Sequence, residues 1–469
     1  MPDFSTIIQA PEIRALVQEN ILERAFHDAL FPQLLFRFEA TPQLWPNNIG
    51  DTMVFTGVGL MKPKLKPLTP GTDPLPSDYP KEQWTSQIQL YADTIDTHMP
   101  TSIVAIADLF LRNAHQMGMG SGQTLNRAVR NRLYNAALSG WTVANGAQGP
   151  TVNLKVKRLN GFNTARNPLL LAGSPVRFDT VSGSNPLPVK IFDQAGPAEV
   201  SRNVISIIPD IPGDFIGPGT LVLDVAVTVL DRAYVFSDDH TAIVRVGGGN
   251  KVDDIGSGDI LRLQDIRAAV ARMRQDNAPA HTDGRYHCHL DPVSETQVFA
   301  DPEWQRLLTS LPDYYMYRQF AIGELLGCVF FRNTEVPQAE TVEGGATATY
   351  SQDDPFAGEL FSNGLTTGVP IHRALFCGQG GILEYYQDLD SLLTDAGITG
   401  RVGQSKITNN GIEVNTDRIQ LILRAPLNRL QDLVATSWKF IGDWPVRTDA
   451  AVGTKARYKR ELVVEHGAA

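Results

Sequence analysis

The feature that most constrains the fold is a proline-rich stretch between two strand-like runs. The first run is TMVFTGVGL, from residue 52, and the second is WTSQIQLYADTIDT, from residue 84. Between them lie prolines 63, 67, 70, 74, 76 and 80. Proline fixes its backbone and donates no hydrogen bond, so this segment is unsuited to the interior of a sheet. We therefore expect a two-stranded hairpin over residues 51–98 with a stiff, extended tip.

This hairpin is long relative to the body that would carry it. About fifteen residues of strand span ~50 Å, whereas a compact chain of 469 residues has a radius of gyration of ~23 Å. A lone two-stranded hairpin is marginally stable in water. Two interpretations remain open: the hairpin is stabilised by another molecule, or it folds back as two strands of its own sheet.

Three lysines mark the tip of the hairpin. Lys62, Lys64 and Lys66 alternate along KPKLKP, which places them on one side of an extended segment. Edge lysines discourage aggregation, but the same residues also suit docking onto an acidic strip of another subunit. We predict them as inter-subunit contact residues, with the protective role as the alternative.

Composition indicates a folded globular protein and excludes several classes. Hydrophobic residues make up 42% and charged residues 20% of the chain. The net charge is -10 and the basic residues are scattered, which does not suit sequence-specific binding of nucleic acid. The three cysteines, at 288, 328 and 377, have no paired spacing and are expected to be buried free thiols. With neither a signal pattern nor ~18 consecutive apolar residues, we expect a cytosolic protein without membrane contact.

Periodicity predicts an α+β chain with an all-β insertion. Helical spacing occurs within residues 10–30, 121–140, 263–277 and 380–397. Short β-like runs separated by turn residues fill residues 149–258. Strand-like runs RIQLILRA, LVATSWKFIGDW and ARYKRELVVEH close the sequence. The glycines of GMGSG, at 118, 120 and 122, lack the lysine of a phosphate-binding loop and are interpreted as a hinge.

The sequence RYHCHLDP is the strongest candidate for chemistry. Strand alternation places His287 and His289 on one face, where they could share a metal with a third ligand, which would be His240, His281, His372 or a carboxylate not located in the sequence. Asp291-Pro292, however, has the pattern of a helix N-cap followed by proline, so a strand that runs into a helix is favoured. The sequence contains no nucleophile elbow, HExxH helix, paired cysteines or EF-hand loop. We predict no catalytic residue, no metal and no cofactor.

The order of these elements resembles the Hong Kong 97-type major capsid proteins of tailed phages. The segment DIRAAVARMRQDNAPAHTDGRYHCHLDPVSETQVFADPEW, followed by GELLGCVFFRNTEVP, is similar to the coat protein of the N-four-like podophages. The matched positions are Arg285, Tyr286, Asp291, Pro292, Asp301, Pro302 and Gly327.

The resemblance implies the Hong Kong 97-like capsid fold. It divides the chain into an N-terminal arm at 1–50, an extended hairpin or E-loop at 51–98, a spine helix and peripheral domain at 99–148, an inserted β-rich domain at 149–258, an axial domain at 259–432 and C-terminal peripheral strands at 433–469. The segment 149–258 is longer than the corresponding connection in typical relatives. We expect it to be exposed on a shell and to stabilise contacts between neighbours.

The function implied is that of a major capsid protein. Such a chain self-assembles into pentamers and hexamers of an icosahedral head in the host cytoplasm and becomes part of the virion capsid. It would enclose double-stranded DNA without sequence-specific contact and would have a portal protein, and a scaffolding or cement protein, as partners. Some relatives cross-link through lysine, but the sequence identifies no partner asparagine.

Three other functions compete with this interpretation. The first is the shell protein of a cellular nanocompartment, which has the same fold and encloses protein cargo. The second is a metal-dependent hydrolase that uses His287 and His289. The third is a carbohydrate-binding module over residues 149–258.

Overall fold

The computed structural model describes most of the chain in separate stretches. They are residues 21–30, 34–46, 50–58, 64–65, 67–74, 81–98, 106–166, 178–192, 199–231, 233–237, 242–249, 254–309, 324–325, 327–336, 369–387, 406–408, 411–416, 418–424, 433–446, 448–450 and 457–467.

The chain forms two compact units. Unit 1 comprises Met1–Val54, Thr85–Arg130 and Ile382–Pro445. Unit 2 comprises Phe55–Trp84, Asn131–Gly381 and Val446–Ala469. No helix in the described part of the chain is both long and apolar enough to cross a lipid bilayer.

Unit 1 is built on a mixed sheet in which β22 pairs along both edges. β22 pairs antiparallel with β21 on one edge and with β4 on the other, while β1 adds a parallel pairing to β18. Thr436, Trp438 and Phe440 alternate along β22 and are buried, as the sequence predicts for one face of a strand. The strands are β1 (Ala40–Leu44), β4 (Gln89–His98), β18 (Ile382–Tyr386), β19 (Lys406–Thr408), β20 (Gly411–Thr416), β21 (Ile419–Arg424) and β22 (Leu433–Asp443).

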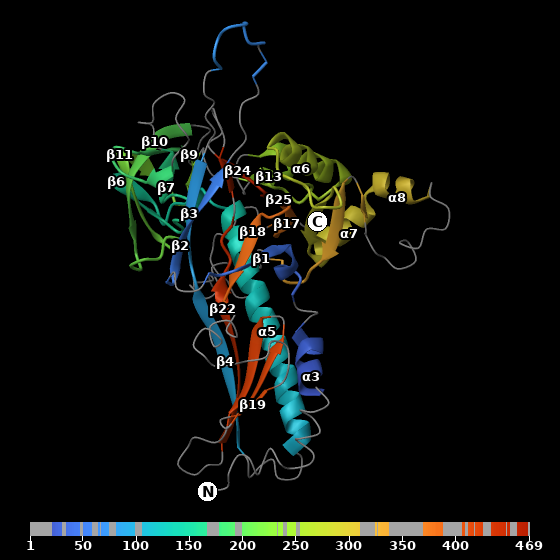
Figure 1. Cartoon of the computed structure of the whole chain (residues 1–469). Helices are drawn as coiled ribbons and strands as arrows, with labels where there is room; N and C mark the ends of the chain where they lie inside the picture. Colours follow the sequence, from blue (N-terminus) through green and yellow to red (C-terminus); the bar gives the residue numbers. More distant parts are fainter. Residues whose placement is uncertain are drawn as a thin grey trace. The chain divides into compact units, whose positions relative to one another are not determined.

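Two helices pack against each other in unit 1 at a glycine. The helices are α3 (Ile21–Leu30) and α5 (Ile106–Ala137), which run side by side in Figure 1. A Cβ atom on Gly118 would lie 2.6 Å from the Phe26 carbonyl oxygen and 2.9 Å from the Ala29 Cβ. The missing side chain therefore permits the close approach. The hinge predicted at Gly118, Gly120 and Gly122 is wrong, because these glycines lie inside α5.

The helix predicted over residues 10–30 is present from residue 21 onward, as α3. Residues 10–20 lie outside the described part of the chain. The helix predicted over 380–397 is wrong at its start, because Ile382–Tyr386 forms β18. A short apolar run such as ILEYY does not distinguish a buried strand from a helix by periodicity.

A buried carboxylate joins four parts of unit 1. Glu384 on β18 accepts hydrogen bonds from Arg37 Nε at 2.7 Å and Nη2 at 2.9 Å. It also accepts from Arg418 Nη1 at 2.6 Å and from Trp444 Nε1 at 3.3 Å. Burial raises the pKa of the Glu384 carboxyl, but the arginine partners outweigh burial and hold that pKa below its ordinary value. The group is therefore ionised at neutral pH and fixes the 3-10 turn Arg37–Glu39 to the sheet.

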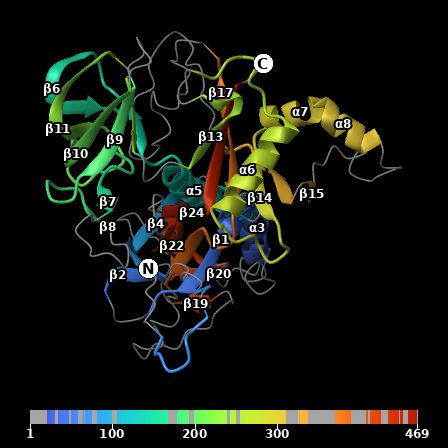
Figure 2. The same ribbon diagram turned by 90° about the horizontal axis from the view of Figure 1, so that it is seen from above.

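In unit 2 an antiparallel sheet closes into a small barrel. The strand order is β5-β12-β9-β10-β11-β6, and the two ends meet through the Ala144–Val156 bridge and the bonds from Asn145 N to Lys155 O and from Lys157 N to Val143 O. Figure 2 shows these strands curled around one another. The strands are β5 (Trp141–Val143), β6 (Gln148–Val156), β9 (Leu187–Phe192), β10 (Glu199–Pro209), β11 (Gly219–Val229) and β12 (Tyr234–Ser237).

The interior of the barrel is filled by aliphatic side chains, so it is a packed core. The barrel differs at both ends from the predicted segment 149–258. It begins earlier, because β5 belongs to it, and the predicted strand near residue 243 lies in another sheet. Beside the barrel, the short strands β7 (Thr164–Arg166) and β8 (Phe178–Thr180) pair with each other.

The second sheet of unit 2 carries helices on one face. Its order is β13-β25-β17-β14-β16-β15. Cys288, Phe376 and Val464 point from the sheet into a core shared with Ile266 and Val270 of α6. The elements are β13 (Ile243–Arg245), β14 (Tyr286–Leu290), β15 (Glu324–Leu325), β16 (Cys328–Arg332), β17 (Ile371–Cys377), β25 (Glu461–Gly467), α6 (Leu263–Gln275), α7 (Pro292–Ala300) and α8 (Pro302–Thr309).

The other face of this sheet holds a buried ion pair. Glu465 on β25 accepts from Arg373 Nε at 3.1 Å and from Arg245 Nε at 3.0 Å. The Tyr134 hydroxyl, from the end of α5, donates to the Arg373 carbonyl at 3.0 Å. The predicted strand ARYKRELVVEH is present as β24 (Arg457–Lys459) and β25. β24 pairs with β23 (Thr448–Ala450).

The contact between α3 and α5 at Gly118 can be tested by replacing glycine with alanine at position 118 and, as a control, at position 120. Gly118→Ala is expected to lower the free energy of unfolding by ~1–3 kcal/mol, because the added methyl group overpacks the contact. Gly120→Ala is the matched control, since a Cβ there meets nothing within 4 Å, and it should raise stability by ~0.5–1 kcal/mol. Urea unfolding of the unassembled chain measures both. Equal stabilisation by the two variants would contradict the packing.

The Glu384 network predicts both a stability loss and a change in its pH dependence. Glu384→Gln should cost ~3–5 kcal/mol at pH 7, because it leaves buried Arg37 without its charge partner. The folded pKa of Glu384 is depressed, so its stabilisation is present above the unfolded pKa and is lost as pH falls through the folded pKa. Urea unfolding from pH 7 to pH 3 should therefore show a shallower acid loss for the variant. If stability falls equally with pH in the wild type and in Glu384→Gln, the proposed role of the Glu384 carboxylate is wrong.

Candidate functional site

The hairpin is the first candidate site, and in the described part of the chain its two strands pair only with each other. β2 (Thr52–Val58) pairs with β3 (Lys81–Gln87), and within the described residues neither strand pairs with another. The second run, predicted as one strand, is divided: β3 belongs to the hairpin, whereas β4 belongs to the sheet of unit 1. The hairpin thus remains a two-stranded ribbon, which is marginal in water.

The root of the hairpin is fixed by a buried carboxylate of unit 1. Asp443, at the end of β22, accepts hydrogen bonds from the Ser86 hydroxyl at 2.6 Å and from the Gln87 amide at 3.2 Å. The amide of Ile88 donates to the Asp51 carbonyl at 2.9 Å. These bonds join residues 86–88, at the end of β3, to Asp443 and Asp51.

The tip of the hairpin contains a hydrogen-bonded turn and is exposed. Thr72 N donates to Thr69 O at 3.2 Å, and Gly71 has a φ of +85°. Proline followed by a positive-φ glycine is the pattern of a type II turn. Every described residue between 64 and 74 is exposed, with Leu65 90% and Leu68 54% accessible. Large apolar side chains exposed to this degree are typical of interaction surfaces when they gather on one element.

The predicted lysines are described only in part. Lys64 is exposed on the tip beside Leu65. Lys62 and Lys66 lie outside the described residues. Their role in contacts between subunits stays a prediction.

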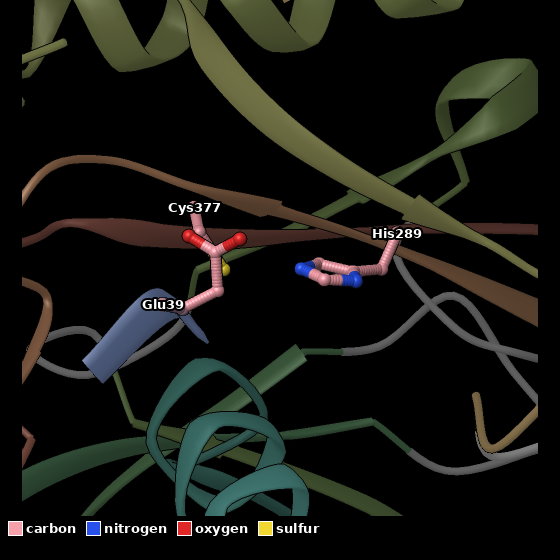
Figure 3. Close-up of side chains that lie close together, drawn as sticks. All are labelled: Glu39, His289 and Cys377. Carbon is pink, nitrogen blue, oxygen red and sulfur yellow. The ribbon is translucent and has the colours of Figure 1, made fainter. Parts of the chain in front are cut away.

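The HCH sequence forms a structural strand. In β14, Tyr286, Cys288 and Leu290 are buried in the core beneath the helices, as the alternation predicts. His287 and His289 lie on the other face, and His289 is 1% exposed. Figure 3 shows the His289 ring and the Cys377 thiol, which come from the paired strands β14 and β17.

The histidines proposed as a third metal ligand are arranged differently from a zinc site. The His281 ring stacks on His287 with centroids 3.7 Å apart and planes 6° apart. The nitrogen lone pairs of the two rings therefore lie in two nearly parallel planes, whereas the ligands of one tetrahedral metal direct their lone pairs to a common point. His372 lies on the opposite face of β17, where its Nδ1 is 2.8 Å from Asp291 Oδ2. His240 lies outside the described residues.

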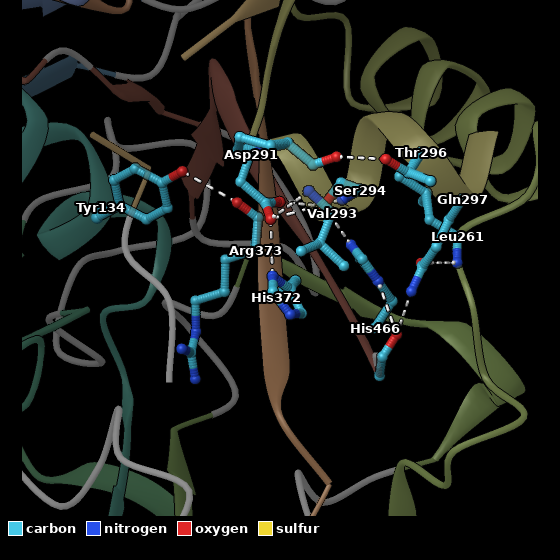
Figure 4. Close-up of polar contacts among 12 residues, drawn as sticks. Tyr134, Leu261, Asp291, Val293, Ser294, Thr296, Gln297, His372, Arg373 and His466 are labelled. Atoms are coloured by element: carbon cyan, nitrogen blue, oxygen red, sulfur yellow. Dashed lines mark hydrogen bonds and ion pairs between the residues drawn. The ribbon is translucent and has the colours of Figure 1, made fainter. Parts of the chain in front are cut away.

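Asp291 is the centre of a second buried network (Figure 4). As predicted, it caps α7 and accepts from the Val293 amide at 3.2 Å, with Pro292 at the first helical position. It also accepts from the Ser294 hydroxyl. Burial raises the pKa of the Asp291 carboxyl, but the hydrogen bonds from His372 and Ser294 lower that pKa by more than burial raises it. The pKa of Asp291 is therefore below its ordinary value.

The same network contains a serine beside a histidine. Ser294 Oγ is 2.8 Å from His466 Nε2, and His466 Nδ1 is 3.1 Å from the Gly467 carbonyl oxygen. This spacing resembles a catalytic pair, but Ser294 and His466 are both 0% exposed, so a substrate has no access to the hydroxyl. Burial lowers the pKa of His466 to about 4. The neutral imidazole therefore joins the end of β25 to α7.

Other positions matched in the sequence also have structural roles. Asp301 Oδ1 accepts from the Glu303 amide at 2.9 Å and Oδ2 accepts from the Leu263 amide at 2.8 Å, so one carboxylate caps α8 and α6. The Tyr286 hydroxyl donates to Ala278 O at 2.8 Å. Gly327 has a φ of +82°, which favours glycine before β16.

The three thiols are buried, as predicted. Burial raises the pKa of the Cys328 thiol to about 12 and raises that of Cys288 well above its usual range. Neither group is an activated nucleophile, because a reactive cysteine needs a lowered pKa.

Comparison with known proteins gives similarities to capsids. No family model matches the sequence, and no curated protein is similar to it. Among solved structures, the chain is similar to the capsid of the cyanophage Pam1, with 10% identity, 92% of this chain and 89% of that chain covered, and a TM-score of 0.47. It is also similar to the capsid of the cyanophage P-SCSP1u, with 11% identity, coverage of 93% and 89%, and a TM-score of 0.45. The capsid of Ralstonia phage GP4 gives 11% identity, coverage of 92% and 87%, and a TM-score of 0.44.

The burial of His466 predicts an acid-sensitive contribution to stability. Its folded pKa of about 4 lies below the ordinary value of 6.5, so the unfolded chain binds a proton that the folded chain does not. Stability is therefore lost as pH falls from 6.5 toward 4, by about 3 kcal/mol from this residue. His466→Gln should show a smaller loss between pH 7 and pH 4.5 in urea unfolding. An unchanged loss would show that His466 is not buried as a neutral group.

Proposed function

We propose that this chain is a self-assembling shell subunit, the major capsid protein of a tailed phage with the Hong Kong 97-like fold. Copies would form pentamers and hexamers through head-to-tail contacts that close into rings. The rings would build an icosahedral head around double-stranded DNA.

The observation that supports this proposal most strongly is the exposed, two-stranded hairpin of β2 and β3. Its two strands pair only with each other among the described residues, and its tip holds Leu65 and Leu68 exposed. A structure that fixes such a ribbon at its root, through Asp443, and stiffens its tip with a proline-glycine turn needs a surface from outside the chain. A second copy supplies that surface in a closed assembly.

The way in which reactive side chains are used also supports a structural role. Ser294, His466 and Asp291 bond to one another beneath the surface. Glu465 and Glu384 hold arginines inside the two units. These groups lock elements together and are inaccessible to a substrate.

The finer features follow from the sequence resemblance. We place the chain with the N-four-like podophage coat proteins and expect a portal protein and a scaffolding or cement protein as partners. Assembly would occur in the host cytoplasm and the product would be part of the virion capsid. With a net charge of -10, the subunit would confine DNA without gripping it.

Removal of the hairpin tests the function directly. In the variant, residues 60–82 are replaced by a short glycine-serine turn. The purified wild-type chain should form closed shells in negative-stain electron microscopy. The variant should remain unassembled but keep the circular dichroism and cooperative unfolding of a folded protein, because residues 64–65 and 67–74 of the deleted segment are all exposed.

Two results would contradict the proposal. One is a wild-type chain that stays monomeric at high concentration, and the other is normal shell yield from the deletion variant. Shells recovered from the native host distinguish the rival compartment function, since a phage head contains DNA and a nanocompartment contains a protein cargo.

A further inference from the structure

The barrel of unit 2 carries a second exposed apolar tip. The loop between β10 and β11, residues 210–218, and the adjoining strand end present Ile208, Ile211 and Phe215 at 54%, 43% and 42% exposure. The barrel core does not need these side chains, because its interior is filled by other residues. A gathering of large apolar side chains at one end of a barrel is typical of a contact surface.

This loop is held in one conformation. Asp214 N donates to Ile211 O at 3.0 Å across Pro212 and Gly213, and Gly213 has a φ of +86°. Asp214 Oδ1 also accepts from the Ile216 and Gly217 amides at 2.9 Å and 3.1 Å. The turn has the same proline-glycine design as the hairpin tip. Two preformed tips lose little conformational entropy when they bind.

The two tips have opposite charge. Residues 209–218 contain Asp210 and Asp214 and no basic residue. Residues 61–74 contain three lysines and one acid, Asp73. Each tip thus combines exposed aliphatic or aromatic side chains with charges that complement those of the other. Complementary charge selects the partner and its register, while the apolar side chains supply the contact.

We propose that the hairpin tip of one copy docks onto the β10–β11 loop of a second copy. Leu65 and Leu68 would pack against Ile211 and Phe215, with Lys64 beside Asp210. Both tips are exposed in the same chain, so a single chain does not bury them against each other. The inference rests on the proposed assembly and adds to it the pair of surfaces that meet.

Cross-linking between two single-cysteine variants tests the contact. Chains with Leu65→Cys are co-assembled with chains with Ile211→Cys and treated with a mild oxidant. A disulfide between them can form only between different chains, and the three native cysteines are buried. The expected result is a disulfide-linked dimer on a non-reducing gel. In the control mixture, chains with Val225→Cys replace the chains with Ile211→Cys, and the yield of linked dimer should be at least tenfold lower. Val225 is 54% exposed on β11 but lies outside the loop.

A charge exchange provides an independent readout. Lys64→Glu should raise the protein concentration needed for assembly by about tenfold, through repulsion from Asp210. Adding Asp210→Lys to that variant should restore the wild-type value to within about threefold. Both residues are exposed, and circular dichroism checks that each variant is folded.

The outcomes separate the inference from the function on which it rests. Shells that form normally without the Leu65–Ile211 cross-link, and without rescue by the charge exchange, overturn this contact but leave the shell function intact. A cross-link equal to that of the Val225 control also overturns it. Failure of the wild-type chain to assemble would contradict both this contact and the proposed shell function.

Discussion

The hairpin of β2 and β3 imposes the constraint from which the rest of the account follows. A two-stranded ribbon has two edges, and in the described part of the chain neither is paired. Its tip is stiffened by Pro70 and Gly71 and exposes Leu65 and Leu68. Within the described residues, no strand of the chain itself covers either edge of the ribbon. The shell subunit proposed above accounts for this arrangement, because a second copy can cover the ribbon.

Both units are suited to bear such a ribbon because buried charges lock their elements in place. In unit 1, Glu384 on β18 accepts hydrogen bonds from Arg37 of a 3-10 turn, from Arg418 just before β21 and from Trp444. In unit 2, Asp291 joins α7 to β17, and Glu465 joins β25 to β13 and β17. Buried ion pairs are costly to break, so they favour one arrangement of the framework. His372, a candidate metal ligand in the sequence, is part of the Asp291 network.

The sequence predicts elements well where local rules determine them. Asp291-Pro292 gave the start of α7, and the alternation in RYHCHL gave the buried face of β14, because capping and strand periodicity depend on neighbouring residues. It failed where tertiary contacts decide. Gly118 has the sequence pattern of a hinge, yet its role is to admit α3 against α5, and ILEYY became a strand because β1 and β22 pair with it. The sequences of β5 and β13 do not indicate which sheet each strand joins. The loop at residues 210–218 is recognised as a candidate contact surface only when its neighbours in space are known.

Hydrogen exchange in the hairpin tests the central claim most directly. Amide exchange in β2 and β3 would be compared between unassembled subunits and assembled particles, with the amides of β14 as an internal reference. The account predicts rapid exchange of the hairpin amides in the free subunit and at least a hundredfold slower exchange after assembly, with β14 protected in both. Hairpin amides as protected in the free subunit as those of β14 would show that the ribbon is stable on its own chain, and would contradict the account.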